Sequence, residues 1–529
     1  MRSSHSLVRG VRLHTVAEPL LEAIRLQQAA RYAEAESQYQ AVLAESPNHP
    51  QATYLYGLLL LGAGNPATAV PMLRAAVALQ PRHTGARINL TRALLADSQP
   101  AAALAEADAA MALAPQMAEA AFLRGTALNA LGQPTEAVAA FSACLAGSPG
   151  HAAAQLNLGN AYTDLDRLAD AERCCRRAIE LNPQLAEAHA SLGFVLTSLG
   201  SLDEAISACQ AAIRLRPDFA QAHWNLAVAA LLAGDFTLGF REYEWRKRHD
   251  RFRRDFINLP GPMWDGSALE GRTLLVHAEQ GFGDTIQFAR YLPLLAASGA
   301  VVLACDRPLL PLLSSLPGVT PVAKDERLPA YDCWLDQMSL PLQCATEADR
   351  IPLAEGYLSA DPLRQAAWSA ALPGGCKVGI AWAGNPLHTN DKRRSLPYAG
   401  LQRLLSAPHI HFVNLQLGPR ADEAGLPALP LPLTDYGETA ALIANLDLVV
   451  TVDTSVAHVA GALGKRCWVM LPFAPDWRWR LNREDTPWYR SVRLFRQPSP
   501  GDWNAVVDAA LNGLREFAAK KGIFLPGKI

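Results

Sequence analysis

The stretch PGHAAAQLNLGNAYTDLDRLADAERCCRRAIELN, residues 149–182, is one unit of a repeat that fills the first half of the chain. The prolines of these units stand 34 residues apart: Pro47, Pro81, Pro115, Pro149, Pro183 and Pro217. Alanines recur at the same interval: Ala35, Ala69, Ala103, Ala137, Ala171 and Ala205. A further column of small residues is Gly57, Thr91, Gly125, Gly159, Gly193 and Ala227. Because small residues let two helices cross closely, the pattern predicts stacked helix pairs, an α solenoid.

A period of 34 residues is that of the tetratricopeptide unit, two antiparallel helices closed by a turn with proline. We predict six units and a partial seventh over residues 16–253. The seventh keeps a first helix over 222–232, but its second helix, 236–245, is aromatic and charged. Terminal repeats are atypical because one face meets no further repeat, so we expect this one to dock on the next domain. Solenoids present long concave surfaces, which favours a protein or peptide partner.

The composition of the 529-residue chain indicates ordered globular domains, with 50% apolar and 19% charged residues. Its net charge of −2 provides no electrostatic footprint for nucleic-acid binding. The nine cysteines show no paired metal-ligand spacing, and an odd count without a framework fits reduced thiols in a cytoplasm. No secretory signal opens the chain, and no apolar run is long enough to span a bilayer. We therefore expect a cytoplasmic protein with no transmembrane segment.

The pattern changes at Thr273, where apolar runs of strand type begin to alternate with loops and helix-period segments. The first set is a strand (273–276), a loop (279–284), a helix (285–295) and a strand (301–305). The second set is the strands 378–382, 411–415 and 447–452, a helix (456–463) and a strand (467–471). We predict a linker over 254–270 and two Rossmann-like α/β domains, 271–372 and 373–529. Ligands of open parallel sheets bind beyond the carboxyl ends of the strands, so we expect the site in the cleft between these domains.

The loop Gln280-Gly281-Phe282-Gly283-Asp284 is the first candidate for a functional site. Gly281 and Gly283 would let the backbone approach a ligand, and Asp284 stands where the helix is predicted to start. The alternative is an ordinary helix cap, for which aspartate is among the best residues. Residue type alone favours the cap. The loop is not a dinucleotide fingerprint, because the third glycine is absent.

The segment Asp453-Thr454-Ser455, where a strand ends and a small-residue helix begins, is the second candidate. Free N–H groups at a helix start favour an anion such as a diphosphate, and the two hydroxyls add donors. His458 follows on the same helix. The alternative is that Thr454 or Ser455 only caps the helix and that His458 is a satisfied core histidine. The clustering of four polar groups at one strand end favours the functional interpretation.

The loop of residues 384–395, directly after the strand that ends at Trp382, is the third candidate. Lys392, Arg393 and Arg394 would neutralise phosphate oxygens there. The alternative is a solvated loop, which is the commoner reason for a run of charge.

The tryptophan- and arginine-rich segment of residues 472–480 is the fourth candidate. Trp477 and Arg478 would wall a base or sugar pocket through stacking, or would only seal the packing between domains. The sequence balances these alternatives evenly.

A metal site finds no support in the sequence. The one Asp-x-Asp, Asp164-Leu-Asp166, lies in a repeat turn. We therefore expect no metal and no cofactor, and a bound diphosphate would be held by helix ends and basic side chains.

Together, these residues resemble the glycosyltransferase family-nine (heptosyltransferase-like) domain with its GT-B fold, over roughly 271–497. The resemblance implies that Asp284, in the Gly-Asp helix opening, is the general base. It implies that Asp453, Thr454 and His458 match the family's Asp-Thr-Gly-x-x-His donor motif, with Ser455 in place of glycine. Arg394 occupies the place of the family's phosphate-binding lysine. Longer stretches of the sequence, among them residues 472–479, are similar to those of bacterial proteins that fuse tetratricopeptide repeats to this domain.

The layout is also similar to that of the O-linked N-acetylglucosamine transferases, which place a repeat solenoid before a GT-B half. That resemblance implies a ladder of asparagines that grips an extended peptide. Here Asn89, Asn157 and Asn225 recur every 68 residues, and an amide pairs a donor with an acceptor, as a peptide backbone requires. The alternative is that asparagine is only tolerated on a solvent-facing side of the helix.

The function we predict is an inverting, metal-independent transfer of a sugar from a nucleotide-sugar to an acceptor hydroxyl, with the repeats recruiting a protein or peptide. A rival prediction is a non-catalytic adaptor, in which the repeats are the working surface and the second half is a degenerate transferase scaffold.

Overall fold

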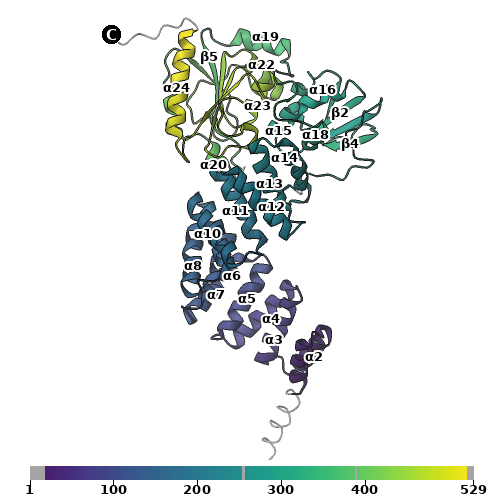
Figure 1. The fold of residues 1–529 in the computed structure, drawn as a ribbon, viewed down its shortest axis with the longest axis vertical. Coiled ribbons are helices and arrows are strands. Elements are labelled where there is room, and N and C mark those ends of the chain that lie inside the picture. The colour runs from purple at the N-terminus through teal and green to yellow at the C-terminus, as the bar shows by residue number, and fades with distance from the viewer. Residues whose placement is uncertain (1–17, 253–255, 388–389, 521–529) are drawn as a thin grey trace, which may run out of the picture. The chain divides into compact units, whose positions relative to one another are not determined.

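The computed structural model describes residues 18–252, 256–387 and 390–520 (Figure 1). The chain divides into two compact units, Met1–Val195 and Leu196–Ile529, and the boundary lies within helix α11 (Ala186–Leu199). The predicted linker at 254–270 is therefore not where the two units part. The last repeat helices belong to the same unit as the α/β half.

The first unit is built of consecutive helix pairs, after a helical segment over residues 18–28 (Figure 1). Its helices are α2 (Tyr32–Glu45), α3 (Pro50–Gly62), α4 (Pro66–Leu79), α5 (Thr84–Ala96), α6 (Pro100–Leu113), α7 (Ala118–Ala130), α8 (Pro134–Gly147), α9 (Ala152–Asp164) and α10 (Leu168–Leu181). This arrangement confirms the predicted α solenoid.

The small-residue column lies where the two helices of a unit cross. A Cβ added to Gly57 would lie 2.8 Å from Leu73 Cγ, and one added to Gly125 would lie 2.6 Å from Phe141 Cε1. Both distances are shorter than van der Waals contact, so a larger residue would push the helices apart. The structure thus confirms the reason inferred for this column.

The recurring prolines lie in the turns between repeats, and some helices that follow are capped by a histidine. The His49 N–H donates to Ser46 O at 3.1 Å and closes one such turn. The His49 Nδ1 atom then accepts from the Ala52 N–H at 3.3 Å, in the role usually taken by a side-chain oxygen. The proline turn and the cap together set where the next helix begins.

The second unit begins with the end of α11 and the last repeat helices. These are α12 (Leu202–Leu215), α13 (Ala220–Ala233), α14 (Phe236–Tyr243), the 3-10 helix η1 (Glu244–Arg248) and η2 (Asp250–Phe252). Side chains of α13 and α14 share one buried core with the first α/β lobe. The atypical seventh repeat therefore docks on the α/β half, as the sequence predicted.

The first α/β lobe has a four-stranded parallel sheet of order β3-β2-β1-β4. Its strands are β1 (Thr273–His277), β2 (Ala300–Cys305), β3 (Val319–Ala323) and β4 (Cys333–Asp336). Its helical segments are α15 (Phe282–Phe288), η3 (Ala289–Tyr291), α16 (Leu292–Leu295), η4 (Arg307–Leu309), α17 (Leu310–Leu313), η5 (Gln337–Ser339) and α18 (Leu340–Gln343). Because β1 pairs with both β2 and β4, the loop after β1 lies at the middle of the sheet's carboxyl edge.

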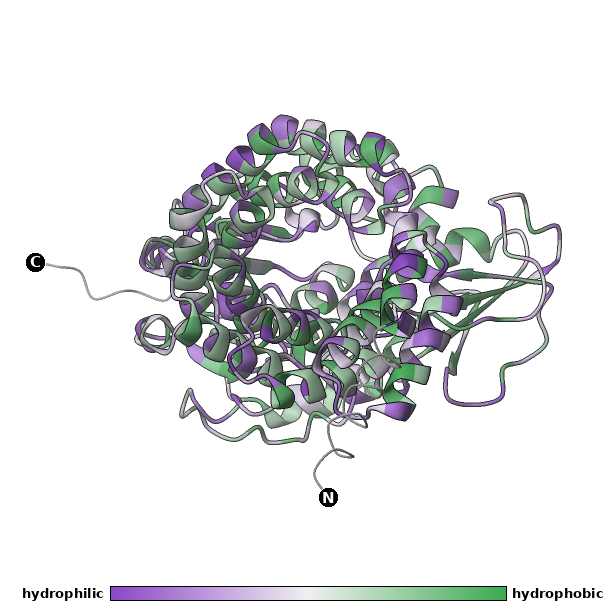
Figure 2. Ribbon diagram, turned by 90° about the horizontal axis from the view of Figure 1, so that it is seen from below, coloured by the Kyte–Doolittle hydropathy of each residue, from purple (hydrophilic) through white to green (hydrophobic). Residues whose placement is uncertain are grey.

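The second α/β lobe has a five-stranded parallel sheet of order β6-β5-β7-β8-β9. Its strands are β5 (Lys377–Ala381), β6 (His411–Asn414), β7 (Leu448–Val452), β8 (Cys467–Leu471) and β9 (Val492–Arg496). The helical segments, from α19 between the lobes onward, are α19 (Pro362–Ala371), α20 (Asp391–Arg394), α21 (Tyr398–Leu405), α22 (Tyr436–Ala444), α23 (Ser455–Ala462), η6 (Trp477–Trp479) and α24 (Trp503–Lys520). The sheet lies between α24 on one side and α22 and α23 on the other (Figure 1). The strands of the first lobe, which stand clear of the helices in Figure 2, are mainly hydrophobic. Two parallel-sheet lobes are compatible with the predicted GT-B fold.

Two local predictions differ from the structure. The helix predicted over 285–295 begins at Phe282, gives way to the 3-10 helix η3 and resumes as α16. The segment predicted as a linker packs against β4: the Trp264 N–H donates to Trp334 O at 2.8 Å, and the Trp334 N–H donates to Pro262 O at 3.1 Å. Backbone pairing holds this part of the segment on the sheet edge, a long-range contact that turn residues in the sequence do not reveal.

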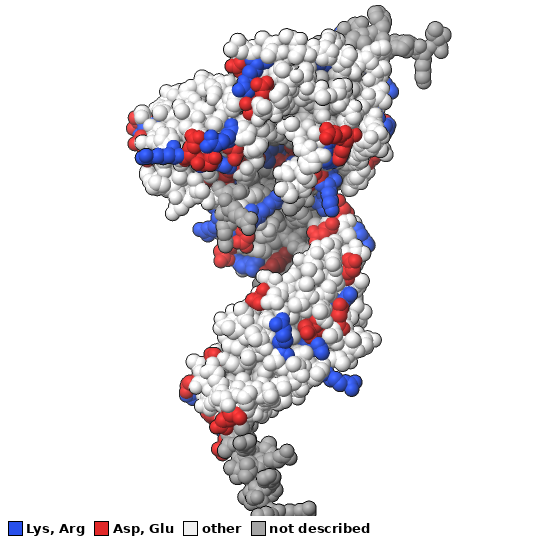
Figure 3. Space-filling view, turned by 180° about the vertical axis from the view of Figure 1, so that it is seen from behind, with Lys and Arg blue, Asp and Glu red and all other residues white. Residues whose placement is uncertain are grey.

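Three features of the described residues bear on partners and ligands. Among them, no helix combines the length and the apolar character needed to cross a bilayer. Across the same residues, no three His, Cys, Asp or Glu side chains are grouped so as to hold a metal ion. On the face shown in Figure 3, basic and acidic side chains are interspersed.

Candidate active site

The loop after β1 carries the first candidate residues and is held in a strained conformation. Gln280 has φ of 63°, in the left-handed region that non-glycine residues rarely adopt. The Gly281 N–H donates to Asp284 Oδ2 at 2.8 Å. Asp284 is thus the third residue of α15, where its carboxylate reaches back to the start of the helix, as in half of a capping box. The capping alternative is therefore realised, although not at the N-cap position itself.

Asp284 also makes an ion pair with the second lobe. Arg478, in η6, donates from Nη2 to Asp284 Oδ1 at 2.5 Å and from Nη1 to Asp476 Oδ1 at 2.8 Å. Its Nε donates to Gln287 Oε1 at 2.6 Å. Only 8% of the Arg478 side chain is exposed. One buried guanidinium therefore joins the loop of the first lobe to the tryptophan-rich segment of the second.

The second candidate segment forms the start of α23. Thr454 is the N-cap residue, and its side chain makes no capping hydrogen bond to the helix. Its hydroxyl lies 3.1 Å from the Thr451 hydroxyl. The Ser455 hydroxyl lies 2.7 Å from the Tyr436 hydroxyl. The Thr454 side chain therefore does not bond the N–H groups at the start of α23. N–H groups left open in this way at a helix start favour an anion.

His458 lies one turn into α23 and is 5% exposed. Its Nδ1 is hydrogen-bonded to the Tyr489 hydroxyl at 3.0 Å. Burial lowers the pKa of His458 well below its usual value, and the positive charges of Arg478 and Arg290 lower it further. The imidazole is therefore uncharged at neutral pH, so it has no positive charge to offer a diphosphate.

The two candidate segments come together where α15 meets α23. A Cβ added to Gly283 would lie 2.8 Å from His458 Cδ2 and 3.6 Å from the Ser455 Cα. Only a glycine fits this approach. The structure therefore brings the Asp284 loop and the start of α23 into direct contact, from segments about 170 residues apart in the chain.

The charged residues predicted to bind the donor are placed differently from one another. Burial and the neighbouring Asp476 raise the pKa of Asp453 to about 6, and the positive charge of Arg394 opposes that rise. Arg394 is 3.3 Å from Asp391 and packs closely over Gly384. Lys392 is exposed on α20. Arg394 is therefore close enough to influence Asp453, whereas donor binding by Lys392 stays a prediction.

For Trp477, the sequence left two alternatives evenly balanced: a pocket wall, or packing between domains. Trp477 is 3% exposed, and its ring meets Phe240 at 5.8 Å and Tyr243 at 6.2 Å, both edge-on. Trp488 completes the cluster at 5.9 Å. Because the repeat helix covers this ring, Trp477 has the packing role and does not wall a pocket.

The asparagine ladder is not supported as a row of free amides. Asn89 donates from Nδ2 to the Tyr54 hydroxyl and to Gly85 O, both at 2.9 Å. Asn225 is 5% exposed and accepts from Gln221 Nε2 at 2.8 Å. Asn157 is half-buried. Because the amides of Asn89 and Asn225 are engaged by groups of the solenoid itself, the prediction that these two bind a peptide backbone is not supported by the geometry.

Sequence reasoning missed several buried groups around the loop. Arg246, which directly follows the aromatic second helix predicted for the last repeat, is fully buried and donates to Glu279 through two nitrogens, at 2.6 and 3.1 Å. Tyr489, the partner of His458, and Gln287, the partner of Arg478, were also missed. A charged residue beside the aromatic second helix of the last repeat was the available signal for Arg246.

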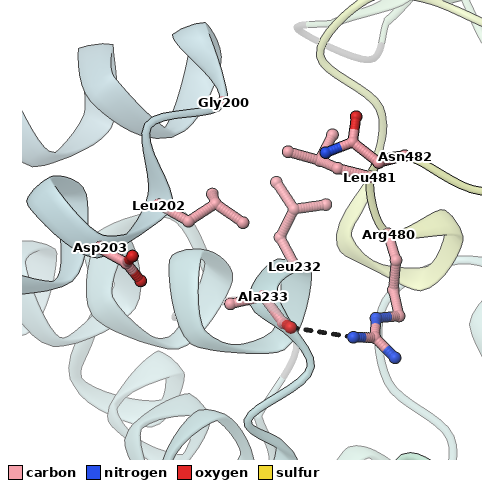
Figure 4. A pocket seen from close by; sticks show the side chains of 8 residues that line it. All are labelled: Gly200, Leu202, Asp203, Leu232, Ala233, Arg480, Leu481 and Asn482. Atoms are coloured by element: carbon pink, nitrogen blue, oxygen red, sulfur yellow. Dashed lines mark hydrogen bonds between the residues drawn. The ribbon is translucent and has the colours of Figure 1, made fainter.

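A cavity of about 330 Å³ lies in the second unit, beside the last repeats (Figure 4). It is lined by Gly200, Leu202, Asp203, Leu232, Ala233, Arg480, Leu481 and Asn482. Arg480 closes one side by donating to Ala233 O at 2.9 Å. A second cavity of about 320 Å³ lies between α19 and the segment before α22. Neither cavity is lined by the candidate residues at the start of α15 or α23.

Residues 424–469 resemble glycosyltransferase family 9. The family model for glycosyltransferase family 9 (heptosyltransferase) matches this range, which contains β7, α23 and the segment from Asp453 to His458. Tetratricopeptide-repeat models match residues 20–84, 88–152, 128–193 and 195–234. The chain therefore carries tetratricopeptide repeats followed by a segment similar to this transferase family.

Protein FlbA of Caulobacter vibrioides is 30% identical over 327 residues, which are 55% of this chain and 54% of FlbA. The chain thus spans about half the length of this curated relative. A solved tetratricopeptide repeat protein from Parabacteroides merdae is 13% identical, with a TM-score of 0.40, over 45% of this chain and 94% of that chain. MamA from Desulfovibrio magneticus is 20% identical, with a TM-score of 0.30, over 32% of this chain and 96% of that chain.

Proposed function

We propose that the protein is a glycosyltransferase that moves a sugar from a nucleotide-sugar donor to an acceptor hydroxyl, with inversion and without a metal ion. One observation carries the proposal: the Asp284 loop contacts the start of α23 through Gly283 and His458. An acidic side chain and a helix start that favours anions are thereby neighbours at the carboxyl edges of two parallel sheets. The match of residues 424–469 to glycosyltransferase family 9 supports the same reaction class.

In the proposed reaction, a carboxylate oxygen of Asp284 accepts the proton of the acceptor hydroxyl while the hydroxyl oxygen bonds to the anomeric carbon. The bond from that carbon to the diphosphate oxygen breaks on the opposite face, and the nucleoside diphosphate leaves with the electron pair. A carboxylate has about four acceptor positions. The bonds from Gly281 and Arg478 use two of them, so the carboxylate keeps positions at which it can accept a further hydrogen bond.

The charge that develops on the leaving diphosphate needs donors in fixed positions. The N–H groups at the start of α23 would provide them, with the Thr454 and Ser455 hydroxyls beside them. Arg394, which already acts on Asp453, would add a positive charge. Burial keeps His458 uncharged, so we assign it to shaping the floor of the site and not to neutralising phosphate.

The repeats would recruit a protein or peptide that carries the acceptor or brings it. The tetratricopeptide matches support a role in protein interaction. Of the three asparagines, Asn157 remains the candidate for contact with a peptide backbone.

A second candidate function, the non-catalytic adaptor, is favoured by one observation. Both oxygens of Asp284 already have partners within the protein, and Arg478 provides a structural reason for an aspartate at this position. In an adaptor, this ion pair would serve only to hold the two lobes together.

The decisive experiment measures donor binding and turnover with UDP-, GDP- and ADP-sugars as probes. We expect calorimetric binding of at least one probe, and a loss of about 10²–10⁴-fold in turnover for Asp284→Asn with binding retained. The matched control is Asp361→Asn, because Asp361 also caps a helix, α19, through two N–H groups but lies outside the site. No binding of any probe favours the adaptor, and equal turnover of Asp284→Asn and wild type rejects the role of Asp284.

A further inference from the structure

The seventh repeat reaches the candidate catalytic loop through buried polar groups. Arg246, in η1, donates from Nη2 to Glu279 Oε1 at 2.6 Å and from Nε to Glu279 Oε2 at 3.1 Å. The side chains of both residues are fully buried. Glu279 Oε1 also accepts from the Met338 N–H at 3.1 Å. The two-pronged ion pair therefore ties the first residue of the loop to the repeat, and the bond from Met338 ties it to η5, directly after β4.

A second contact holds the strained residue of the loop. The Tyr243 hydroxyl, at the end of α14, donates to Gln280 Oε1 at 3.3 Å. Gln280 is the loop residue with positive φ, a conformation that persists only when its surroundings determine it. The next residue, Gly281, makes the hydrogen bond to Asp284. The conformation fixed at Gln280 thus sets where the Asp284 carboxylate points.

The same repeat also packs against the other half of the site. Phe240 and Tyr243 cover Trp477, the residue directly before Arg478. Arg478 in turn grips Asp284 from the second lobe. The C-terminal end of α14 therefore supports both the loop that bears Asp284 and the segment that carries Arg478, the partner of the Asp284 carboxylate.

We propose that the seventh repeat is a working part of the active site, in which Tyr243 and Arg246 are positioning residues for the loop of Asp284. This inference rests on the proposed function only in the part that concerns turnover. Its geometric part, that the repeat sets the conformation of residues 279–284, stands without it. A reaction that depends on one carboxylate loses about a hundredfold when that group shifts by an ångström, so such support has direct consequences for rate.

The test uses the full chain with Tyr243→Phe, which removes one hydroxyl and keeps the ring over Trp477. The control is Tyr39→Phe, because Tyr39 lies on the second helix of an earlier repeat and its buried hydroxyl likewise donates to a glutamine Oε1, at 2.6 Å. Amide hydrogen exchange is measured over 279–285, and kcat, KM and donor affinity are measured with the UDP-, GDP- and ADP-sugars named above.

We expect Tyr243→Phe to raise exchange at Gly281 about fivefold and to lower kcat by a similar factor, the equivalent of one neutral hydrogen bond. Donor affinity and KM stay unchanged, a split that a general loss of stability would not produce. Arg246→Lys, which keeps the charge but loses the two-pronged bond, is expected to act more strongly in the same direction. Tyr39→Phe changes neither readout.

The two proposals fail in different ways. If no probe is turned over by the wild type, the proposed function fails, and the exchange measurement still decides whether the repeat positions the loop. If exchange over 279–285 is the same in Tyr243→Phe, Arg246→Lys and wild type, the positioning role is overturned, whatever the turnover.

Discussion

Gly283→Ala is the substitution that tests most directly whether α15 and α23 meet as the structure places them. The added methyl would stand 2.8 Å from His458 Cδ2, about 0.6 Å short of ordinary van der Waals contact. The imidazole cannot swing away freely, because it is buried and bonded to Tyr489. The clash must therefore separate the two helices or displace the histidine.

The magnitude follows from two opposing effects. Overpacking a buried contact costs about 1–3 kcal/mol, whereas replacing a helical glycine by alanine gains about 1 kcal/mol in helix propensity. Gly283 has no positive φ, so the backbone itself accepts alanine. We expect a net loss of about 1 kcal/mol in the free energy of unfolding, together with weaker donor binding, because Ser455 and His458 would move.

The assay is denaturant unfolding of the full chain, with Gly62→Ala as the matched control. Gly62 is also helical, in α3, and a Cβ there would meet nothing within 4 Å. The control should therefore show the propensity gain alone. If Gly283→Ala is stabilised as much as Gly62→Ala, the close approach of the two helices is wrong, and the shared site is wrong with it.

The remaining predictions concern pH and metal. The pKa of Asp453 is raised to about 6 from 3.8 in the unfolded chain, so the native state binds the proton more tightly. The stability that Asp453 contributes is present below pH 4 and is lost as pH rises through 6. Asp453→Asn should remove this dependence and stabilise the protein at pH 7–8 by up to about 3 kcal/mol, since one pKa unit corresponds to about 1.4 kcal/mol. The measurement is the free energy of unfolding of variant and wild type from about pH 4 to pH 8. A difference between them that is the same at every pH would contradict the assignment. Turnover of any donor should survive excess EDTA, and restoration of lost turnover by Mg²⁺ would overturn the metal-independent mechanism.

Sequence periodicity predicted the solenoid well because each tetratricopeptide unit contacts mainly its neighbours. The small residues at Gly57 and Gly125 reported a local crossing of two helices, and the structure has that crossing. The α/β half was predicted from strand and helix patterns, and its two parallel sheets are present. The helix predicted over 285–295 was wrong in detail. It gives way to η3 at Ala289 and resumes as α16, with Pro293 as the second residue of α16. Proline has no N–H to donate to the carbonyl four residues earlier, so a local feature of the sequence accounts for this break.

The site was predicted in part. Asp284 and the segment from Asp453 to His458 stood out because glycines and polar residues gathered at strand ends, and the structure brings these two segments together. Arg246 did not stand out, because the neighbouring residues in the sequence do not distinguish a buried arginine from an exposed one. Its partner, Glu279, lies 33 residues away.

By itself, the sequence determined the repeat, the order of the domains and which residue types end the strands, since these depend on spacing along the chain. Only the tertiary structure decided that Arg478 forms an ion pair with Asp284, that Gly283 contacts His458 and that the last repeat contacts the loop of residues 279–284. Such contacts join residues far apart in the chain. They depend on how whole helices and sheets pack, and no local pattern of residues encodes that packing.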